Sequence, residues 1–405
     1  MKRPIYLYIV PFFPAPNYWR GGFFYDAVKS LQADGRYDVK VISTSEVGHD
    51  YDYEGIHVID LRKKYYGSSQ YFESLLEGVN DRILERKLKS VGIDVNDVAV
   101  CHIHDHNHYV HYATFIKKRN PQCLTLVHHH YSGWYDVEFG RLHNCPILAD
   151  LRYLHLRSQY NQIDAHVFIS EDSHNCFGLT RLQNSCKEFK ELRKTLAFGS
   201  LLPKLKYNDS YVWYNGVDKE VFKPVEGEKR QGHVIGCVGN FNIGKAQIDL
   251  IKAFVGIKEH YSDAQLKMVG SGQMMQTCMD YAQKHGIADS VEFIREMPHS
   301  QLADFYRTLD LFVMPSINEG FCCVNAEANA CGVPAMACEG LPFEELLSDE
   351  DKKIWLFPKH NPEAITRQVI RFFENPQIQT LTKNLDSNFL ASKFLNWVDC
   401  KMEQL

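Results

Sequence analysis

Short apolar runs alternate with segments of helical periodicity along most of the chain, and this alternation limits the possible folds more than any other feature. A short apolar run bounded by turn residues is typical of a buried strand, and apolar residues that recur three or four positions apart indicate a helix. Phe24, Val28 and Leu31, directly behind Gly21-Gly22, show such a helical spacing. Strands that alternate with helices build parallel sheets with helices on both faces. We therefore predict an α/β fold.

The alternation occurs in two series that are separated by a break. The segment WYNGVDKEVFKP at 213–224 contains Asn-Gly and Pro, which interrupt regular structure, and the polar segment EGEKRQGH follows it. The predicted strands are Ile5–Val10, Val39–Ser43, Ile56–Ile59, Val98–Ile103, Leu124–Val127 and Ala165–Ile169 before the break, and Val234–Val238, Leu266–Val269, Val291–Ile294, Leu311–Met314 and Pro334–Ala337 after it.

The length of 405 residues also favours two domains, because a single core rarely serves more than about 250–300 residues. We predict a first domain over 1–215, a second over 216–385, and a C-terminal helix over 386–405 that crosses back to the first domain. Parallel sheets of this kind bind ligands at the carboxyl ends of their strands. We therefore expect two doubly wound, Rossmann-like domains that face a cleft, with the chemistry in that cleft.

Charge and composition exclude several classes of protein. Lys and Arg total 45 against 50 for Asp and Glu, a formal charge of -5, so there is no overall attraction to nucleic acid. No apolar run approaches the ~20 residues of a membrane helix, and prolines interrupt the apolar N-terminus, which we interpret as a strand and not as a signal peptide. The 12 cysteines form no C-x-x-C pair, which favours reduced thiols and a cytoplasmic location.

The stretch MPSINEGFCCVNAEANACGVPAMA at 314–337 carries the most specific chemical signal. A predicted strand ends there, Glu319 and Gly320 lie in a loop, and a helix begins near Cys322 with Glu327 on it. A glycine lets the backbone approach a ligand, and a helix N-terminus offers unpaired N–H groups and partial positive charge, so a phosphate fits there. Glu319 lies before the helix start and Glu327 lies on the helix. Their carboxylates can accept hydrogen bonds from hydroxyls at opposite ends of a ligand, and sugars and riboses carry such hydroxyls.

The segment from Glu319 to Glu327 resembles the E-x7-E signature of retaining glycosyltransferases of family 4, which have the GT-B fold. Other parts of 211–345 resemble the same family in chain order. They are Asn215-Gly216-Val217-Asp218 with Phe222 and Pro224, Val238-Gly239 with Lys245, Val269-Gly270-Ser271-Gly272, and Gly332-Val333-Pro334. The resemblance implies a metal-independent hexosyl- or N-acetylhexosaminyltransferase of polysaccharide biosynthesis, which uses a nucleotide-sugar donor and a glycan, lipid-linked or small-molecule acceptor.

The resemblance also implies roles for individual residues. In the family the first glutamate contacts the hydroxyls of the donor sugar and the second contacts the ribose, which gives these roles to Glu319 and Glu327. Lys245 would stabilise the leaving diphosphate. The remaining donor-binding candidates are Gly22, Gly239, Asn240, Gly270, Gly272 and the backbone of Gly320, Phe321 and Cys322. No cofactor and no metal are expected.

Two positions depart from the family pattern. Asn240 stands where the family usually has an Arg, so one of two cations for the diphosphate is missing, and Arg295 is a candidate substitute. Stabilisation of leaving-group charge is a large term in such a reaction, so this loss would weaken activity unless another basic residue replaces it. Cys322 stands where a Gly is usual and adds a side chain near the donor.

The loop before Gly22 is long and aromatic, with Phe12, Phe13, Tyr18 and Trp19 as candidates for an acceptor pocket. The alternative is a surface loop packed by its own aromatic residues.

Histidines gather at two predicted strand ends. His102, His104, His106 and His108 share one strand face, as metal ligands do, and raise metal-dependent hydrolysis as a rival function. We do not expect a metal there, because no carboxylates are spaced around them. Three histidines follow Leu124–Val127, where the family carries a His that faces the donor sugar, and His128 fits that position best. A histidine that caps the strand end without a catalytic role is the alternative.

Three functions stay open. The first is glycosyl transfer, and the second is a non-catalytic GT-B subunit that binds a glycan or a partner protein, which Asn240 keeps open. The third is a GT-B enzyme of other chemistry, such as a nucleotide-sugar epimerase or a phosphorylase. The seven basic residues between Arg181 and Lys206 form either a solvated helix face or a peripheral contact with an anionic membrane that holds a lipid-linked acceptor. The oligomeric state is unknown.

Overall fold

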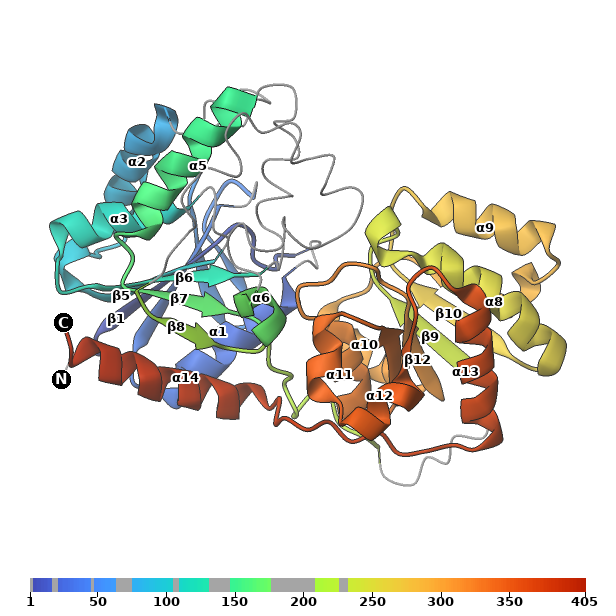
Figure 1. Cartoon of the computed structure of the whole chain (residues 1–405). Coiled ribbons are helices and arrows are strands. Elements are labelled where there is room, and N and C mark those ends of the chain that lie inside the picture. Colours follow the sequence, from blue (N-terminus) through green and yellow to red (C-terminus); the bar gives the residue numbers. More distant parts are fainter. Residues whose placement is uncertain are drawn as a thin grey trace. The chain divides into compact units, whose positions relative to one another are not determined.

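A computed structural model describes residues 3–16, 21–44, 47–62, 75–104, 109–130, 146–175, 208–225 and 232–405. The chain forms two compact units (Figure 1). The N-terminal unit contains Met1–Tyr214 together with Asn388–Leu405, and the C-terminal unit contains Asn215–Ser387.

The described strands of the N-terminal unit form an eight-stranded sheet in the order β3-β4-β2-β1-β5-β6-β7-β8. Neighbouring strands are parallel except β3 and β4, which form an antiparallel hairpin. The strands are β1 (Ile5–Val10), β2 (Asp38–Ser43), β3 (Tyr51–Tyr53), β4 (Ile56–Asp60), β5 (Val98–His104), β6 (Leu124–His129), β7 (Ala165–Phe168) and β8 (Ser210–Val212). The helices are α1 (Gly22–Asp34), α2 (Glu77–Ser90), α3 (Val110–Arg119), α5 (Pro146–Tyr160), α6 (Glu171–Asn175) and α14 (Ser387–Met402).

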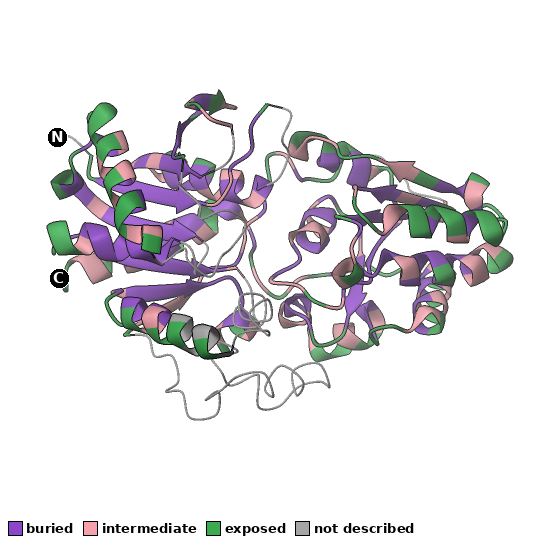
Figure 2. Ribbon diagram, turned by 90° about the horizontal axis from the view of Figure 1, so that it is seen from above, coloured by how far each residue is buried: buried purple, intermediate pink, exposed green. Residues whose placement is uncertain are grey.

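Helices cover both faces of this sheet, which explains why the central strand β1 is buried along its whole length. Leu7 and Ile9 point to the face covered by α2, α3 and α5, whereas Tyr6 and Tyr8 point to the face covered by α1 and α14. All residues of β1 are buried, and Figure 2 shows the strands of this unit as mostly buried.

Helix α14 accounts for most of the predicted C-terminal helix and packs on the N-terminal unit. Phe394 stacks on Trp213 at a ring distance of 4.1 Å. Asp399 accepts hydrogen bonds from Arg36 Nη1 at 2.7 Å and from the hydroxyl of Tyr37 at 2.6 Å. The end of the chain is thus held by both apolar packing and charge-assisted hydrogen bonds.

The C-terminal unit contains a six-stranded, wholly parallel sheet in the order β11-β10-β9-β12-β13-β14. Its strands are β9 (Val234–Val238), β10 (Gln265–Val269), β11 (Val291–Ile294), β12 (Leu311–Met314), β13 (Ala335–Cys338) and β14 (Leu356–Phe357). Its helices are α8 (Gln247–His260), α9 (Met275–Lys284), α10 (His299–Arg307), α11 (Cys323–Ala330), α12 (Asp349–Trp355) and α13 (Pro362–Glu374). The predicted α/β class, with two doubly wound sheets, is confirmed.

Three strands were not predicted, and all three lie at sheet edges. β3, β8 and β14 contain three, three and two residues, too few for a clear apolar pattern. β3 begins beside Asp50, whose carboxylate accepts the N–H of Asp60 and pairs with Lys87.

The loops that follow β9 and β10 lie backbone to backbone. Gly239 N donates to Val269 O at 2.9 Å, and Phe241 N donates to Ser271 O at 2.8 Å. A side chain on Gly270 would collide with the carbonyl group of Gly239, and one on Gly272 would collide with that of Phe241. The absence of side chains at Gly270 and Gly272 therefore lets the two loops pack against each other.

We expect Gly270→Ala to lower the free energy of unfolding by about 1–3 kcal/mol, the usual cost of overpacking. The methyl group would separate the two loops, and the φ of 144° at this position adds backbone strain. Chemical denaturation of the full chain measures the change. Gly286→Ala is the matched control, because Gly286 has a positive φ of 67° but nothing within 4 Å of an added Cβ. Equal losses in both variants would contradict the loop contact.

No helix in the described ranges is both long and apolar enough to cross a membrane.

Candidate active site

Lys245 is positioned by the turn between β9 and α8. The side chain of Asn242 accepts the backbone N–H of Lys245 at 2.9 Å and so caps the short 3-10 helix Ile243–Lys245. Ala246 then takes a left-handed conformation, with a φ of 48°, and α8 begins at the next residue. This sharp turn places the Lys245 side chain at the carboxyl end of the sheet.

The ammonium group of Lys245 contacts Glu319 Oε1 in a short charge-assisted hydrogen bond. The side chain of Lys245 is 25% exposed and that of Glu319 only 9%. Burial by itself would lower the pKa of Lys245, but the negative charge of Glu319 outweighs it and raises this pKa above its ordinary value. Lys245 is therefore a cation throughout the working pH range, held beside a carboxylate.

The residues between Glu319 and α11 form a tight turn. Phe321 is buried, with 2% of its surface exposed, and its expected backbone contact with the donor stays a prediction. Cys322 has φ 72° and ψ 60°, a left-handed conformation, and its thiol contacts Asn325 Oδ1 at 2.7 Å. The left-handed backbone conformation at position 322 explains why Gly is the usual residue there. This conformation limits the choice of residue more than the space for a side chain does.

We expect Cys322→Gly to keep donor binding and folding close to wild type, because glycine takes the left-handed conformation without strain. Cys322→Val should lower the free energy of unfolding by about 1–3 kcal/mol, since a β-branched residue is strained at positive φ. Thermal and chemical denaturation of the two variants measure this. A Cys322→Val protein as stable as Cys322→Gly would show that the turn can relax.

Glu327 is held in one orientation by two residues of α10. Tyr306 donates its hydroxyl to Glu327 Oε2 at 2.8 Å, and His299 Nε2 lies 3.1 Å from Glu327 Oε1. Burial, and then the charge of Glu327, raise the pKa of Tyr306 well above its ordinary value, so the hydroxyl stays protonated and can donate. Each carboxylate oxygen keeps a further lone pair for a ligand hydroxyl.

Neither His299 nor Tyr306 was predicted as a site residue. They lie seven positions apart on α10, two turns along one helix face, and that spacing is the signal that was available in the sequence.

The other donor-binding candidates of this unit lie at the same, carboxyl end of the sheet. The carbonyl groups of Gly239 and Asn240 accept hydrogen bonds from Gln247 Nε2 at 3.2 and 3.0 Å. Arg295 follows β11, two strands away from β9, which corresponds to roughly 10 Å at the usual strand spacing. It is exposed and forms no ion pair within the described part of the chain, so it is available to bind an anion.

In the N-terminal unit, Gly21 caps α1 with a φ of 92°, and Gly22 is its buried first residue. Phe12 packs on Phe24 at a ring distance of 5.5 Å. Phe13 is fully buried and lies near Tyr25 of α1 and Tyr53 of β3, each at a ring distance of 6.5 Å. The other candidates for the acceptor pocket, Tyr18 and Trp19, lie outside the described residues, as do His106, His108 and the basic segment 181–206.

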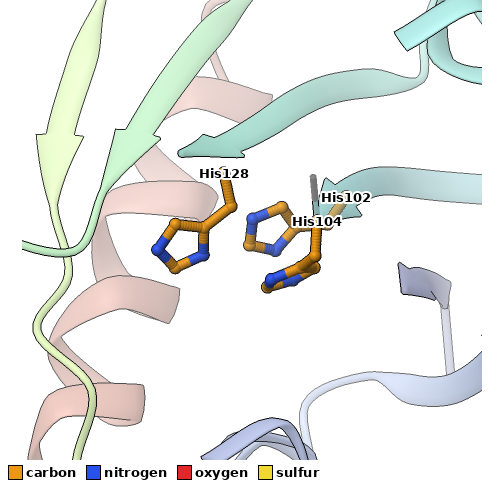
Figure 3. A group of neighbouring side chains, drawn as sticks. All are labelled: His102, His104 and His128. Carbon is orange, nitrogen blue, oxygen red and sulfur yellow. The ribbon is translucent and has the colours of Figure 1, made fainter. Parts of the chain in front are cut away.

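His128 lies one residue before the carboxyl end of β6, which is two residues longer than predicted. The side chain is buried beside His102 and His104 (Figure 3). Burial, and then the neighbouring His130, lower the pKa of His128 well below its ordinary value, so the ring is neutral. Its expected contact with a donor sugar stays a prediction.

Comparisons with known proteins agree with this description. Residues 218–388 match the family model described as Glycosyl transferases group 1. An uncharacterised glycosyltransferase of Methanocaldococcus jannaschii is 24% identical over 344 residues, which are 83% of this chain and 80% of the relative. A second one from that organism is 27% identical over 195 residues, 48% of this chain, and the chain spans 52% of its length.

Solved structures resemble the whole chain. Sucrose-phosphate synthase from Thermosynechococcus elongatus superposes with a TM-score of 0.65 at 18% identity, covering 100% of this chain and 97% of that one. Anabaena HepE, solved in complex with UDP and glucose, superposes with a TM-score of 0.67 at 14% identity, covering 98% and 100%.

The fold is therefore that of the GT-B glycosyltransferases. Within that class, the C-terminal unit matches the model of the glycosyl transferases group 1 family over nearly its whole length.

Proposed function

We propose that the chain transfers a sugar from a nucleotide-sugar donor, bound by the C-terminal unit, to a hydroxyl of a glycan, lipid-linked or small-molecule acceptor. The transfer retains the anomeric configuration and needs no metal ion on the diphosphate. The observation that carries this proposal is the contact of Lys245 with Glu319 beside the N-terminus of α11, within the family-matched region.

Each group has a task that follows from its charge. As the bond between the sugar C1 and the phosphate oxygen breaks, negative charge grows on the diphosphate, and Lys245 with the N–H groups of α11 stabilises it. An ammonium group has three donors, so Lys245 can keep Glu319 and still bind a phosphate oxygen. The acceptor oxygen bonds to C1 from the same face, and its proton passes to the leaving phosphate oxygen.

The two glutamates would hold the two ends of the donor. Glu319 lies in a loop and would accept hydrogen bonds from sugar hydroxyls, while Glu327 is on α11 and would accept them from the ribose. The hydrogen bonds from Tyr306 and His299 support the second assignment, because they fix the Glu327 carboxylate before a ligand arrives.

A thermal-shift comparison tests the proposal directly. UDP, GDP and ADP, alone and as their hexose derivatives, are added to the full chain in the presence of either EDTA or magnesium. A ligand at 100 times its dissociation constant adds about 2.7 kcal/mol of stability. The nucleotides that carry the base of the natural donor should therefore raise the melting temperature clearly. The expected shift is equal in EDTA and in magnesium. No shift with any nucleotide, or a shift that EDTA removes, would contradict the proposal.

Product analysis separates transfer from the alternatives. With a donor that binds, a transferase releases the nucleoside diphosphate mainly when an acceptor is present. An epimerase instead yields a nucleotide sugar with a changed sugar. A phosphorylase needs inorganic phosphate. Binding without any of these reactions would indicate the non-catalytic subunit, which the Asn240 position keeps open.

A further inference from the structure

Three histidines of the N-terminal unit form a compact buried cluster. His102 and His104 are alternate residues of β5 and so share one face, and His104 lies directly opposite His128 of β6 in the parallel register. One ring nitrogen of each residue lies within 4.8 Å of the other two (Figure 3). The three side chains are 0%, 1% and 3% exposed.

All three rings of this cluster have unused hydrogen-bonding capacity. His102 Nε2, His104 Nε2 and both nitrogens of His128 have no hydrogen-bond partner in the described part of the chain. A neutral imidazole has one donor and one acceptor nitrogen, and a buried polar atom without a partner costs free energy. Three such rings side by side are therefore unfavourable unless something binds their lone pairs.

The other ring nitrogens of two of these residues are held by hydrogen bonds. His102 Nδ1 lies 2.6 Å from the hydroxyl of Tyr6, and His104 Nδ1 lies 3.0 Å from His130 Nε2. A metal bound at Nε2 of His102 and His104 requires that Nδ1 of each ring donates, with Tyr6 and His130 as the acceptors. Such a hydrogen bond from the second ring nitrogen fixes the orientation of histidines that bind metals.

The chemistry of the cluster selects the class of ion. Imidazole nitrogen suits zinc, cobalt, nickel and copper, whereas magnesium and calcium prefer oxygen ligands. Imidazole binds a metal in its neutral form. A zinc–nitrogen bond is about 2.0–2.1 Å long, so rotation of the rings has to bring the nitrogens somewhat closer than they now are.

We propose that His102, His104 and His128 bind one divalent transition-metal ion, with zinc as the first candidate, and that this ion ties the carboxyl ends of β5 and β6 together. The sequence predicts no metal at these histidines, because the strand should turn into a loop there and no carboxylates are spaced around them. The adjacent strand supplies His128, and a site of three histidines needs no carboxylate. The diphosphate has no part in this site, since the C-terminal unit would hold it without a metal.

The test uses the full chain. The protein is stripped with a strong chelator, incubated with zinc or cobalt, desalted, and assayed for metal content and melting temperature. We expect about one ion per chain, a higher melting temperature with zinc, and visible cobalt absorption typical of nitrogen ligands without the near-ultraviolet band of thiolate. Stripped wild-type protein that takes up no zinc, or a cobalt spectrum with thiolate bands, would overturn the proposal.

Two variants locate the ion. His104→Gln should reduce the metal content at least tenfold and remove the stabilisation by zinc. His166→Gln is the matched control, because His166 is also fully buried but lies on the opposite face of the sheet, bonded to His129. It should retain the metal. Unchanged metal content in His104→Gln would overturn the proposal, and if that variant fails to fold, the uptake of zinc by the stripped wild-type chain still decides the question.

Discussion

Replacement of Lys245 by alanine is expected to lower turnover of the nucleotide sugar by about 100- to 1,000-fold, as the loss of one preorganised group that stabilises developing charge usually does. Lys245 is held beside Glu319 at the carboxyl end of the sheet. Because Asn240 stands in the place of the family's usual Arg, we expect Lys245 to be the main cation that binds the leaving diphosphate. Because the diphosphate carries charge before and during the reaction, its affinity should fall together with the rate.

Initial rates and diphosphate binding by calorimetry measure both effects. Lys252→Ala is the matched control, because Lys252 lies on α8 but is 41% exposed and faces Asp249 at 3.8 Å. Its rates should stay near wild type. The Lys245→Ala variant also leaves Glu319 without its cation, so the double variant with Glu319→Gln should regain stability without regaining turnover. Near wild-type turnover in Lys245→Ala would show that another group carries the charge.

Substitution of the two glutamates by glutamine should produce two different kinetic results. Glu319→Gln should lower turnover by about 100-fold with a donor constant close to wild type, because its contacts tighten as the sugar ring gains positive charge in the transition state. It also removes the counter-ion of Lys245. Glu327→Gln should mainly raise the donor constant, by about tenfold, since contacts to the ribose are similar before and during the reaction.

The structure adds a stability difference to this prediction. Glu327 accepts hydrogen bonds on both oxygens, from Tyr306 and from His299, and glutamine offers only one acceptor oxygen. Glu327→Gln should therefore also lower the free energy of unfolding by about 1–3 kcal/mol, the cost of a lost buried partner. Glu363→Gln, an exposed position on α13, controls for the loss of one charge. The role assignment is wrong if both active-site variants change only the donor constant.

Much of the fold could be predicted from local patterns. The strand at Ile5–Val10 is buried on both faces, so its apolar run is continuous and bounded, and its limits were predicted as they are found. The turn from Glu319 to α11 was also predictable, because a glycine and a helix start are encoded in adjacent residues. The edge strand β8 was missed because its three residues are half-buried and carry no apolar contrast.

What the sequence by itself determined is therefore local: two series of strands and helices, the loops at the strand ends, and the placing of Glu319 and Glu327 around a helix start. The tertiary structure decided which of these loops meet. Lys245 contacts Glu319 across 74 positions because β9 and β12 are neighbours in the sheet. Glu327 accepts a hydrogen bond from Tyr306 because α10 packs beside α11. His128 joins His102 and His104 because the register of β5 and β6 brings their carboxyl ends level, and register depends on the packing of a whole sheet and not on any one segment.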